Sequence, residues 1–219
     1  DSSTSRGLGD VYKRQLVDLP LCRERVENVR IFREKSSRAQ TKKAAATPQR
    51  YGTEIITSST SVLVPKVSSE RRRYIPLGFI GPETFCSDLV FLIADASVYQ
   101  FGVLHSQFHN AWMRTVCGRL ESRYRYSGGV VYNNFVWPNP TSKQQEAIEA
   151  CAQAILDTRD NYPDKSLANL YDPDKMPADL LAAHRALDAA VEAAYGVNFD
   201  GDEEKIVAHL FKLYAQATA

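Results

Sequence analysis

The stretch Trp137-Pro138-Asn139-Pro140 decides how this chain of 219 residues is divided. Neither a helix nor a strand continues through it, because two prolines lack the amide donor and restrict the residues before them. The part before it carries 20 Lys and Arg against 12 Asp and Glu, whereas the part after it carries 7 against 14. The net charge of +1 therefore hides a basic and an acidic part, and we place a domain boundary between Trp137 and Pro138.

Residues 138–219 have the apolar spacing and the capping residues of a small antiparallel helical bundle. The first helix is expected to begin after Thr141, in a capping box with Gln144, and to end before Tyr162. The second is expected between Pro177 and Gly196, and the last begins at Asp200 or Asp202. The aspartates at 172–174 and 200–202 lack the full ligand set of a calcium loop. They are predicted to be turn and cap residues.

The basic part, residues 16–137, is predicted to mix helices with strands, so the fold class expected for the chain is α+β. The expected elements are a solvated helix over 23–46, a loop over 48–60, strands at 61–65 and 89–94 (the second one buried), a helix over 99–116 and a strand at 130–132. Gly128-Gly129 between alternating flanks is typical of a hairpin. Residues 1–15 look like translated adapter sequence and are expected to be a non-native, disordered leader.

Composition excludes several classes of protein. The chain is 44% hydrophobic and 24% charged, which excludes wholesale disorder and a fibrous repeat. No apolar run approaches the roughly 20 residues that a membrane helix needs. Four widely spaced cysteines without a CxxC pair argue against a zinc ribbon or a disulfide framework and favour a reducing compartment. We therefore expect a soluble, cytoplasmic protein without a membrane partner.

The sequence carries no recognisable catalytic, cofactor-binding or metal-binding motif. His105 and His109 lie one helical turn apart, but the Glu of a zinc-protease helix and a third ligand are missing. There is no G-x-G-x-x-G and no P-loop, and no Ser, Cys or His has a recognisable nucleophile setting. Asn133-Asn134-Phe135 lacks the two prolines of the adenine-methyltransferase tetrapeptide. We expect no catalytic, cofactor or metal site in this chain.

Two arginine clusters in the basic part are candidates for contact with nucleic acid. One follows two hydroxyl groups and the other interleaves arginines with tyrosines, and arginine suits bidentate recognition of phosphate or guanine. The candidate DNA-binding residues are Ser68, Ser69, Arg71, Arg73, Arg119, Arg123, Tyr124, Arg125 and Ser127. The alternative is that these arginines brace the fold by pairing with Glu70 and Glu121 while the tyrosines are core.

Several motifs resemble one protein family in the same order along the chain. They are the run 64–76 with Ser68-Ser69-Glu70-Arg71-Arg72-Arg73-Tyr74, the runs 101–112, 118–127 and 131–138, and, in the acidic part, 166–173, Met176-Pro177 and 184–188. They resemble the target-recognition region and the C-terminal helical domain of the MmeI-like DNA methyltransferases, which are large single-chain restriction–modification enzymes. The resemblance runs from about Leu16 onward, and the family more often has proline at the position of Val136.

The resemblance implies a division of labour with sequence outside this chain. In the family, an upstream Rossmann-like domain binds S-adenosylmethionine and methylates adenine N6, and many members carry an N-terminal nuclease. The implied partners are double-stranded DNA and the upstream methyltransferase domain of the same polypeptide, and the fragment alone is expected to be inactive.

Two alternatives stay open, a stand-alone nucleic-acid-binding protein and a helical structural adaptor. Methyltransferase motifs directly upstream in the intact gene would select the recognition fragment. An initiator Met near Leu16 would favour the alternatives.

Overall fold

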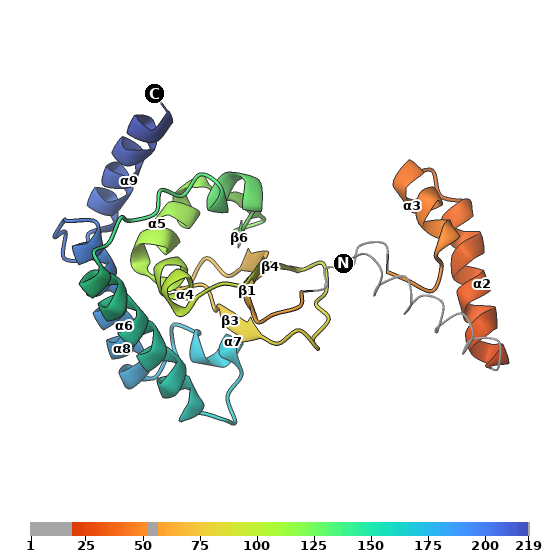
Figure 1. Cartoon of the computed structure of the whole chain (residues 1–219), viewed down its shortest axis with the longest axis horizontal. Coiled ribbons are helices and arrows are strands. Elements are labelled where there is room, and N and C mark those ends of the chain that lie inside the picture. The colour runs from red at the N-terminus through yellow and green to blue at the C-terminus, as the bar shows by residue number, and fades with distance from the viewer. Residues whose placement is uncertain (1–18, 52–56, 219) are drawn as a thin grey trace. The chain divides into compact units, whose positions relative to one another are not determined.

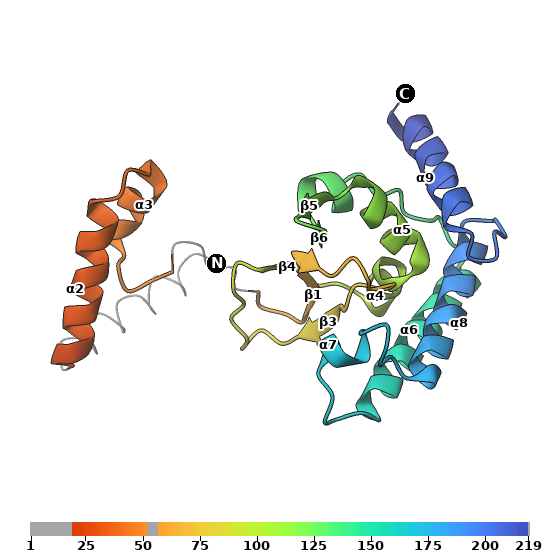
Figure 2. The ribbon, with the colours of Figure 1, turned by 180° about the vertical axis from the view of Figure 1, so that it is seen from behind.

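Figures 1 and 2 show the computed structural model of the chain, which describes residues 19–51 and 57–218. The chain divides into two compact units, residues 1–55 and 56–219. The leader predicted at residues 1–15 and the middle of the loop predicted at 48–60 lie outside the described residues. Within the described ranges, no helix is long and apolar enough to cross a membrane.

The N-terminal unit contains the helices α2 (Pro20–Glu34) and α3 (Ala39–Lys43) and a 3-10 turn, η1 (Ala44–Ala46). The single helix predicted over residues 23–46 is wrong, because the chain turns back after α2. The guanidinium of Arg33 stabilises this reversal by donating to the carbonyl oxygens of Ala44 at 2.9 Å and Arg50 at 2.8 Å. A continuous helix would carry these carbonyls out of its reach.

The second unit contains two small antiparallel sheets. In the first, β1 (Ser61–Pro65) lies between β3 (Gly78–Ile80) and β4 (Val90–Ala94). In the second, β6 (Arg123–Arg125) lies between β2 (Val67–Ser68) and β5 (Gly118–Leu120). The two predicted strands are confirmed as β1 and β4, although β4 is half-buried and not buried. Only Lys66 separates β1 from β2, so continuous backbone ties the two sheets together.

The helices α4 (Val98–His105) and α5 (Gln107–Val116) form the buried centre of the second unit. The single helix predicted over 99–116 is wrong, because Ser106 is extended, with ψ of 163°. The hydroxyl of Ser106 donates to the carbonyl of Val103 at 2.7 Å, and a carboxylate oxygen of Asp188 accepts from the amide of Gln107 at 2.7 Å. The apolar spacing of residues 99–116 could not reveal the break at Ser106, because the carboxylate that accepts from Gln107 comes from a distant part of the chain.

A hairpin does occur in the second arginine cluster, but at another turn than the predicted one. Glu121 and Ser122 connect β5 to β6, and Glu121 has a positive φ of 57°. The strand predicted at 130–132 is wrong, because Gly128–Tyr132 form a π-helical turn. The indole of Trp112 stabilises this turn by donating to the carbonyl of Val131 at 3.0 Å.

Four helices follow Pro140: α6 (Ser142–Asp160), α7 (Leu167–Leu170), α8 (Ala178–Ala194) and α9 (Glu203–Thr218). The predicted helical C-terminal part is confirmed. The capping box of Thr141 and Gln144 is present at the start of α6, and Gly196, with φ of 71°, follows α8.

The aspartate clusters have the predicted turn and cap roles. An oxygen of Asp172 accepts from the amide of Asp174 at 3.0 Å, which closes a turn. An oxygen of Asp202 accepts from the amide of Lys205 at 3.2 Å, so this residue caps α9.

The helices after Pro140 pack on the helices before it as well as on one another. Helix α6 packs against both α8 and α4, and α9 packs against α5 (Figure 1). Helices α4 and α6 approach closely at Gly102 of α4, where an added β carbon would lie 2.9 Å from Cγ2 of Ile148 and 3.1 Å from Cβ of Ala152. The hydrophobic core therefore continues across the stretch in which we predict the domain boundary.

Candidate nucleic-acid interface

The arginines of the β5–β6 hairpin lie on two different faces. Side chains alternate along β6, so Arg123 and Arg125 are exposed on one face while Tyr124 is buried on the other. Arg119 of β5 lies opposite Tyr124 and shares its face, with the guanidinium carbon 4.1 Å from the centre of the tyrosine ring. The second candidate cluster is therefore split, and only Arg123 and Arg125 project together.

These two exposed arginines differ in their partners. Arg123 donates to Glu121 at 2.7 Å, and both side chains are exposed, so water screens the pair and it stabilises little. Arg125 makes no side-chain hydrogen bond or ion pair with any residue that the structure describes. A phosphate or a guanine edge would therefore meet the free guanidinium of Arg125 and that of Arg123, which is easily released from Glu121.

Two of the other candidates, Ser68 and Tyr124, are buried, and Ser127 is half-buried with its hydroxyl engaged in a cap. Ser68 lies opposite Tyr124 in the β2–β6 ladder and is only 4% exposed. The hydroxyl of Ser127 accepts from the amide of Val130 at 3.2 Å and so caps the π-helical turn. We therefore expect direct contacts from the arginines and from Ser69, and not from Ser68, Tyr124 or Ser127.

The arginine run that follows β2 contacts elements far away in the sequence. Arg71 forms an exposed ion pair of 2.6 Å with Asp174 and not with Glu70. Of the two pairings that the alternative interpretation expects, the one with Glu121 is present, through Arg123, and the one with Glu70 is not. Arg72 approaches the carbonyl of Ala168 at 3.4 Å. The acidic C-terminal part thus contacts the arginine run directly.

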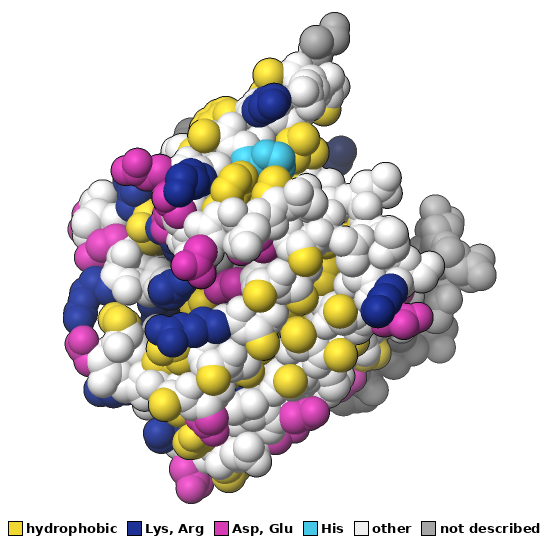
Figure 3. Space-filling view, turned by 90° about the vertical axis from the view of Figure 1, so that its left-hand side faces the viewer, with side chains coloured by type: hydrophobic (Ala, Val, Ile, Leu, Met, Phe, Trp, Pro, Cys, Tyr) yellow, Lys and Arg dark blue, Asp and Glu magenta, His cyan; other side chains and the backbone are white. Residues whose placement is uncertain are grey.

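A hollow of about 370 Å³ lies beside this run. Its lining includes four guanidinium groups and two carboxylates, those of Arg71, Arg72, Arg73, Arg114, Glu70 and Glu203. On the face drawn in Figure 3, Lys and Arg side chains likewise gather next to Asp and Glu side chains. Carboxylates therefore offset part of the positive charge that a polyanion would meet.

A buried polar network behind the arginine run was not among the predicted functional residues. Arg159 of α6 donates to the carbonyl of Leu77 at 2.8 Å, to the hydroxyl of Tyr171 at 2.9 Å and to the ring of His105 at 3.3 Å. It forms no ion pair with a carboxylate in the described part of the chain. The signal was available in the sequence, because Arg159 lies four residues after Ile155 on the buried face of α6.

The same network continues to the tyrosine that ends the arginine run. The hydroxyl of Tyr171 lies 2.8 Å from Nε2 of His184, whose ring stacks on Tyr74 with 4.2 Å between centres. The hydroxyl of Tyr74 donates to Asp188 at 2.6 Å. Residues of α6 and α8, with Tyr171 directly after α7, thus fix the end of the segment that carries Arg71–Arg73.

Burial shifts the pKa of several groups in this core. Because desolvation disfavours the charged imidazole, the pKa of His109 falls to about 4, and those of His105 and His184 lie well below 6.5. Desolvation also raises the pKa of Asp188 to about 6, although hydrogen bonds from Tyr74 and Gln107 oppose the rise. The core therefore holds three neutral imidazoles at neutral pH.

We expect the free energy of unfolding to fall as the pH is lowered below the ordinary histidine pKa of 6.5. The unfolded chain then binds protons that the folded chain cannot, which costs about 1.4 kcal/mol per pH unit for each buried histidine. Asp188 acts in the opposite sense between pH of about 6 and its ordinary 3.8, but one carboxylate does not offset three imidazoles. Urea unfolding over this pH range measures the slope.

His109→Gln is the matched variant for this measurement. Glutamine retains a donor and an acceptor for the carbonyl of Leu104 and the hydroxyl of Tyr126, the two partners of the His109 ring. Its slope should be smaller than that of the wild type by about one proton. A free energy of unfolding that stays constant or rises on acidification would contradict the assignment of neutral buried histidines.

Two family models together cover nearly the whole chain. The model described as MmeI, target recognition domain, matches residues 8–139, and the model described as MmeI, C-terminal domain, matches residues 140–219. The chain belongs to the MmeI family.

Individual proteins are similar over almost the same range. DNA methyltransferase A of Bacillus subtilis (strain 168) is 42% identical over 212 residues, which are 96% of this chain and 24% of that protein. A solved structure of the Type IIL restriction-modification enzyme MmeI in complex with DNA matches with a TM-score of 0.91 and 44% identity, covering 94% of this chain and 27% of that chain. The predicted fold class and the predicted MmeI-like recognition region are thereby confirmed, and the chain spans about a quarter of the length of these relatives.

Proposed function

We propose that this chain recognises the DNA sequence at which a larger, site-specific DNA methyltransferase of a restriction–modification system acts. The observation that carries the proposal is the match of 94% of the chain, at a TM-score of 0.91, to an MmeI enzyme solved in complex with DNA. The exposed face of the hairpin, with Arg123 and Arg125, supplies the chemistry that such a role needs.

The remaining functions belong to sequence outside this chain in the same proposal. S-adenosylmethionine and the transfer of a methyl group to adenine N6 are assigned to an upstream methyltransferase domain of the same polypeptide, which is the second partner beside double-stranded DNA. The chain itself should give no heat on titration with S-adenosylmethionine. All four cysteines are free thiols, which supports a cytoplasmic location.

If the chain binds duplex DNA, its affinity should fall steeply with salt, because each phosphate neutralised by arginine releases counterions. We expect a slope of about −0.9 in log affinity against log salt concentration for each phosphate, measured between about 50 and 200 mM salt. Fluorescence anisotropy with a labelled mixed-sequence duplex gives this slope. The whole chain is the sample of choice, because a fragment of residues 138–219 would expose the face of α6 that packs on α4.

Matched variants and a second probe separate this proposal from its alternatives. Arg125→Ala should weaken binding and, if Arg125 contacts a phosphate, lower the slope by about one phosphate. Lys143→Ala, which removes an exposed charge in the acidic part, should change neither the affinity nor the slope. Tighter binding of single-stranded RNA than of duplex DNA would favour a stand-alone nucleic-acid-binding protein. No binding to either nucleic acid would favour the helical adaptor.

A further inference from the structure

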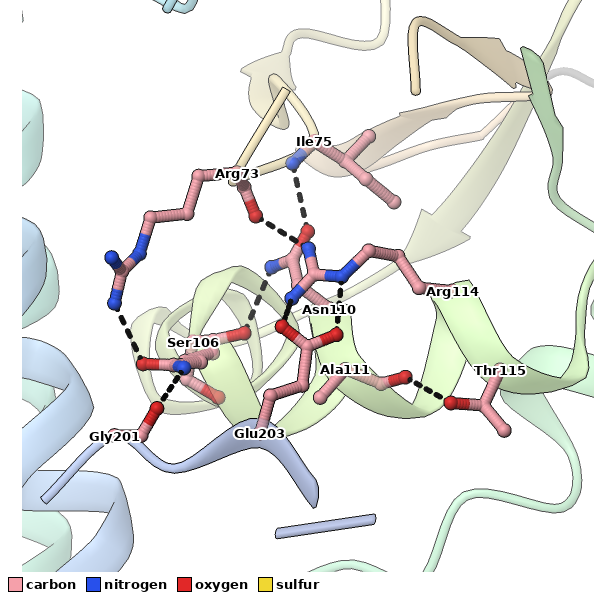
Figure 4. A network of polar contacts seen from close by, with 10 residues as sticks. Arg73, Ile75, Ser106, Asn110, Ala111, Arg114, Thr115, Gly201 and Glu203 are labelled. Atoms are coloured by element: carbon pink, nitrogen blue, oxygen red, sulfur yellow. Dashed lines mark hydrogen bonds and ion pairs between the residues drawn. The ribbon is translucent and has the colours of Figure 1, made fainter. Parts of the chain in front are cut away.

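Helix α5 holds the backbone on both sides of Tyr74. The side-chain oxygen of Asn110 accepts from the amide of Ile75 at 2.8 Å, and Arg114 donates to the carbonyl of Arg73 at 2.7 Å (Figure 4). The two residues lie four positions apart, so they lie on the same side of α5. The end of the arginine run is therefore fixed by backbone contacts as well as by its side chains.

The residue that fixes Arg114 comes from the C-terminal part. Glu203, in the first turn of α9, accepts from Nε of Arg114 at 2.7 Å and from Nη2 at 2.8 Å. This bidentate, charge-assisted contact leaves the third nitrogen of the guanidinium aimed at the carbonyl of Arg73, as Figure 4 shows. Only 13% of the Arg114 side chain is exposed, against 44% of Glu203, so the pair is partly shielded from water.

A second path from the C-terminal part reaches the side chain of Arg73. Its guanidinium donates to the side-chain oxygen of Gln107 at 2.9 Å. The side-chain nitrogen of Gln107, Nε2, donates in turn to the carbonyl of Gly201, two residues before Glu203, at 2.7 Å. The loop that leads into α9 therefore orients the side chain of Arg73 while Glu203 acts on its backbone.

We propose that Glu203 is a positioning residue for DNA recognition, and that it acts through Arg114 on the backbone of Arg73. This inference rests on the proposed function, because it takes Arg73 as a DNA contact. The simple electrostatic effect has the opposite sign: a carboxylate beside four arginines repels phosphate, so its neutralisation would strengthen DNA binding. The sign of the change in affinity therefore separates a positioning role from a charge effect.

The test compares Glu203→Gln with Glu204→Gln in the whole chain. Both variants remove one negative charge from the first turn of α9 and weaken its interaction with the helix dipole alike, but Glu204 is exposed and is absent from the Arg114 contact. We expect Glu203→Gln to bind a mixed-sequence duplex about fivefold more weakly than the wild type. Its thermal stability should fall little or not at all. Glu204→Gln should bind equally well or slightly more tightly.

A double-mutant cycle with Arg73→Ala identifies the path. If Glu203 acts through Arg73, Glu203→Gln should cause no further loss of affinity once Arg73 is alanine. Affinity of Glu203→Gln equal to or above that of Glu204→Gln would overturn the inference, as would an equal loss in both backgrounds. If Arg73→Ala weakens binding while Glu203→Gln does not, the inference fails and the proposed function stands. If the wild-type chain does not bind duplex DNA, the proposed function fails and the inference fails with it.

Discussion

Replacement of Arg159 by alanine should lower the free energy of unfolding by about 3 kcal/mol or more. The variant leaves the buried carbonyl of Leu77 without its donor and removes one partner each from Tyr171 and His105. It also empties space in the buried core at the end of α6, where Ile155 lies one turn earlier. Urea unfolding at neutral pH, followed by circular dichroism, measures the loss.

Two further variants show which property of Arg159 matters. Arg185→Ala removes an exposed arginine from α8 and should change stability by less than about 0.5 kcal/mol. Arg159→Lys keeps the charge, but an ammonium group lacks the planar fork that reaches three partners, so most of the loss should remain. Wild-type stability in Arg159→Ala would show that the buried network contributes nothing to the fold.

Replacement of Arg125 by alanine should weaken DNA binding by about 1–3 kcal/mol in free energy, which corresponds to about five- to 150-fold in affinity. Its guanidinium is exposed on the hairpin and has no partner among the described side chains, so nothing else in this part of the chain uses it. A base contact and a phosphate contact give different results. Loss of a base contact relaxes preference at one position of the site, whereas loss of a phosphate contact weakens all sequences alike.

Methylation assays on randomised sites, in the intact enzyme, measure this preference. Arg125→Lys distinguishes the roles, because lysine restores the charge at a phosphate but not the bidentate geometry at guanine. The same assay applies to the other four arginines that we expect to face DNA: Arg71, Arg73, Arg119 and Arg123. Unaltered affinity and unaltered preference in all five alanine variants would contradict the assignment of the interface.

The elements that could be predicted from the sequence are those with local signals. The capping box of Thr141 and Gln144, the left-handed Gly196 and the strand at β1 all depend on residues within one turn or one strand. The break at Ser106 could not be predicted in this way. It depends on Asp188, which accepts from the backbone amide of Gln107 and lies 81 positions after that residue in the chain.

The candidate site shows the same division. That arginines and tyrosines alternate from Arg123 to Tyr126 was visible in the sequence, and alternation already implies two faces once the segment is a strand. The position of the turn was not visible, because Glu121 adopts the left-handed conformation that glycine adopts more readily. The contacts of Arg71 with Asp174 and of Arg114 with Glu203 join residues far apart in sequence, and no spacing rule relates them.

The close approach of α4 to α6 at Gly102 bears on any attempt to transplant recognition specificity between relatives. A chimera joined at Trp137 would combine the recognition part of one protein with the α6 of another. A larger residue at the position of Ile148 or Ala152 would then clash with α4, because even a β carbon added at Gly102 would lie within 3.1 Å of these two side chains. The exchangeable cassette that preserves this contact is the whole second unit, with its C-terminal helices included.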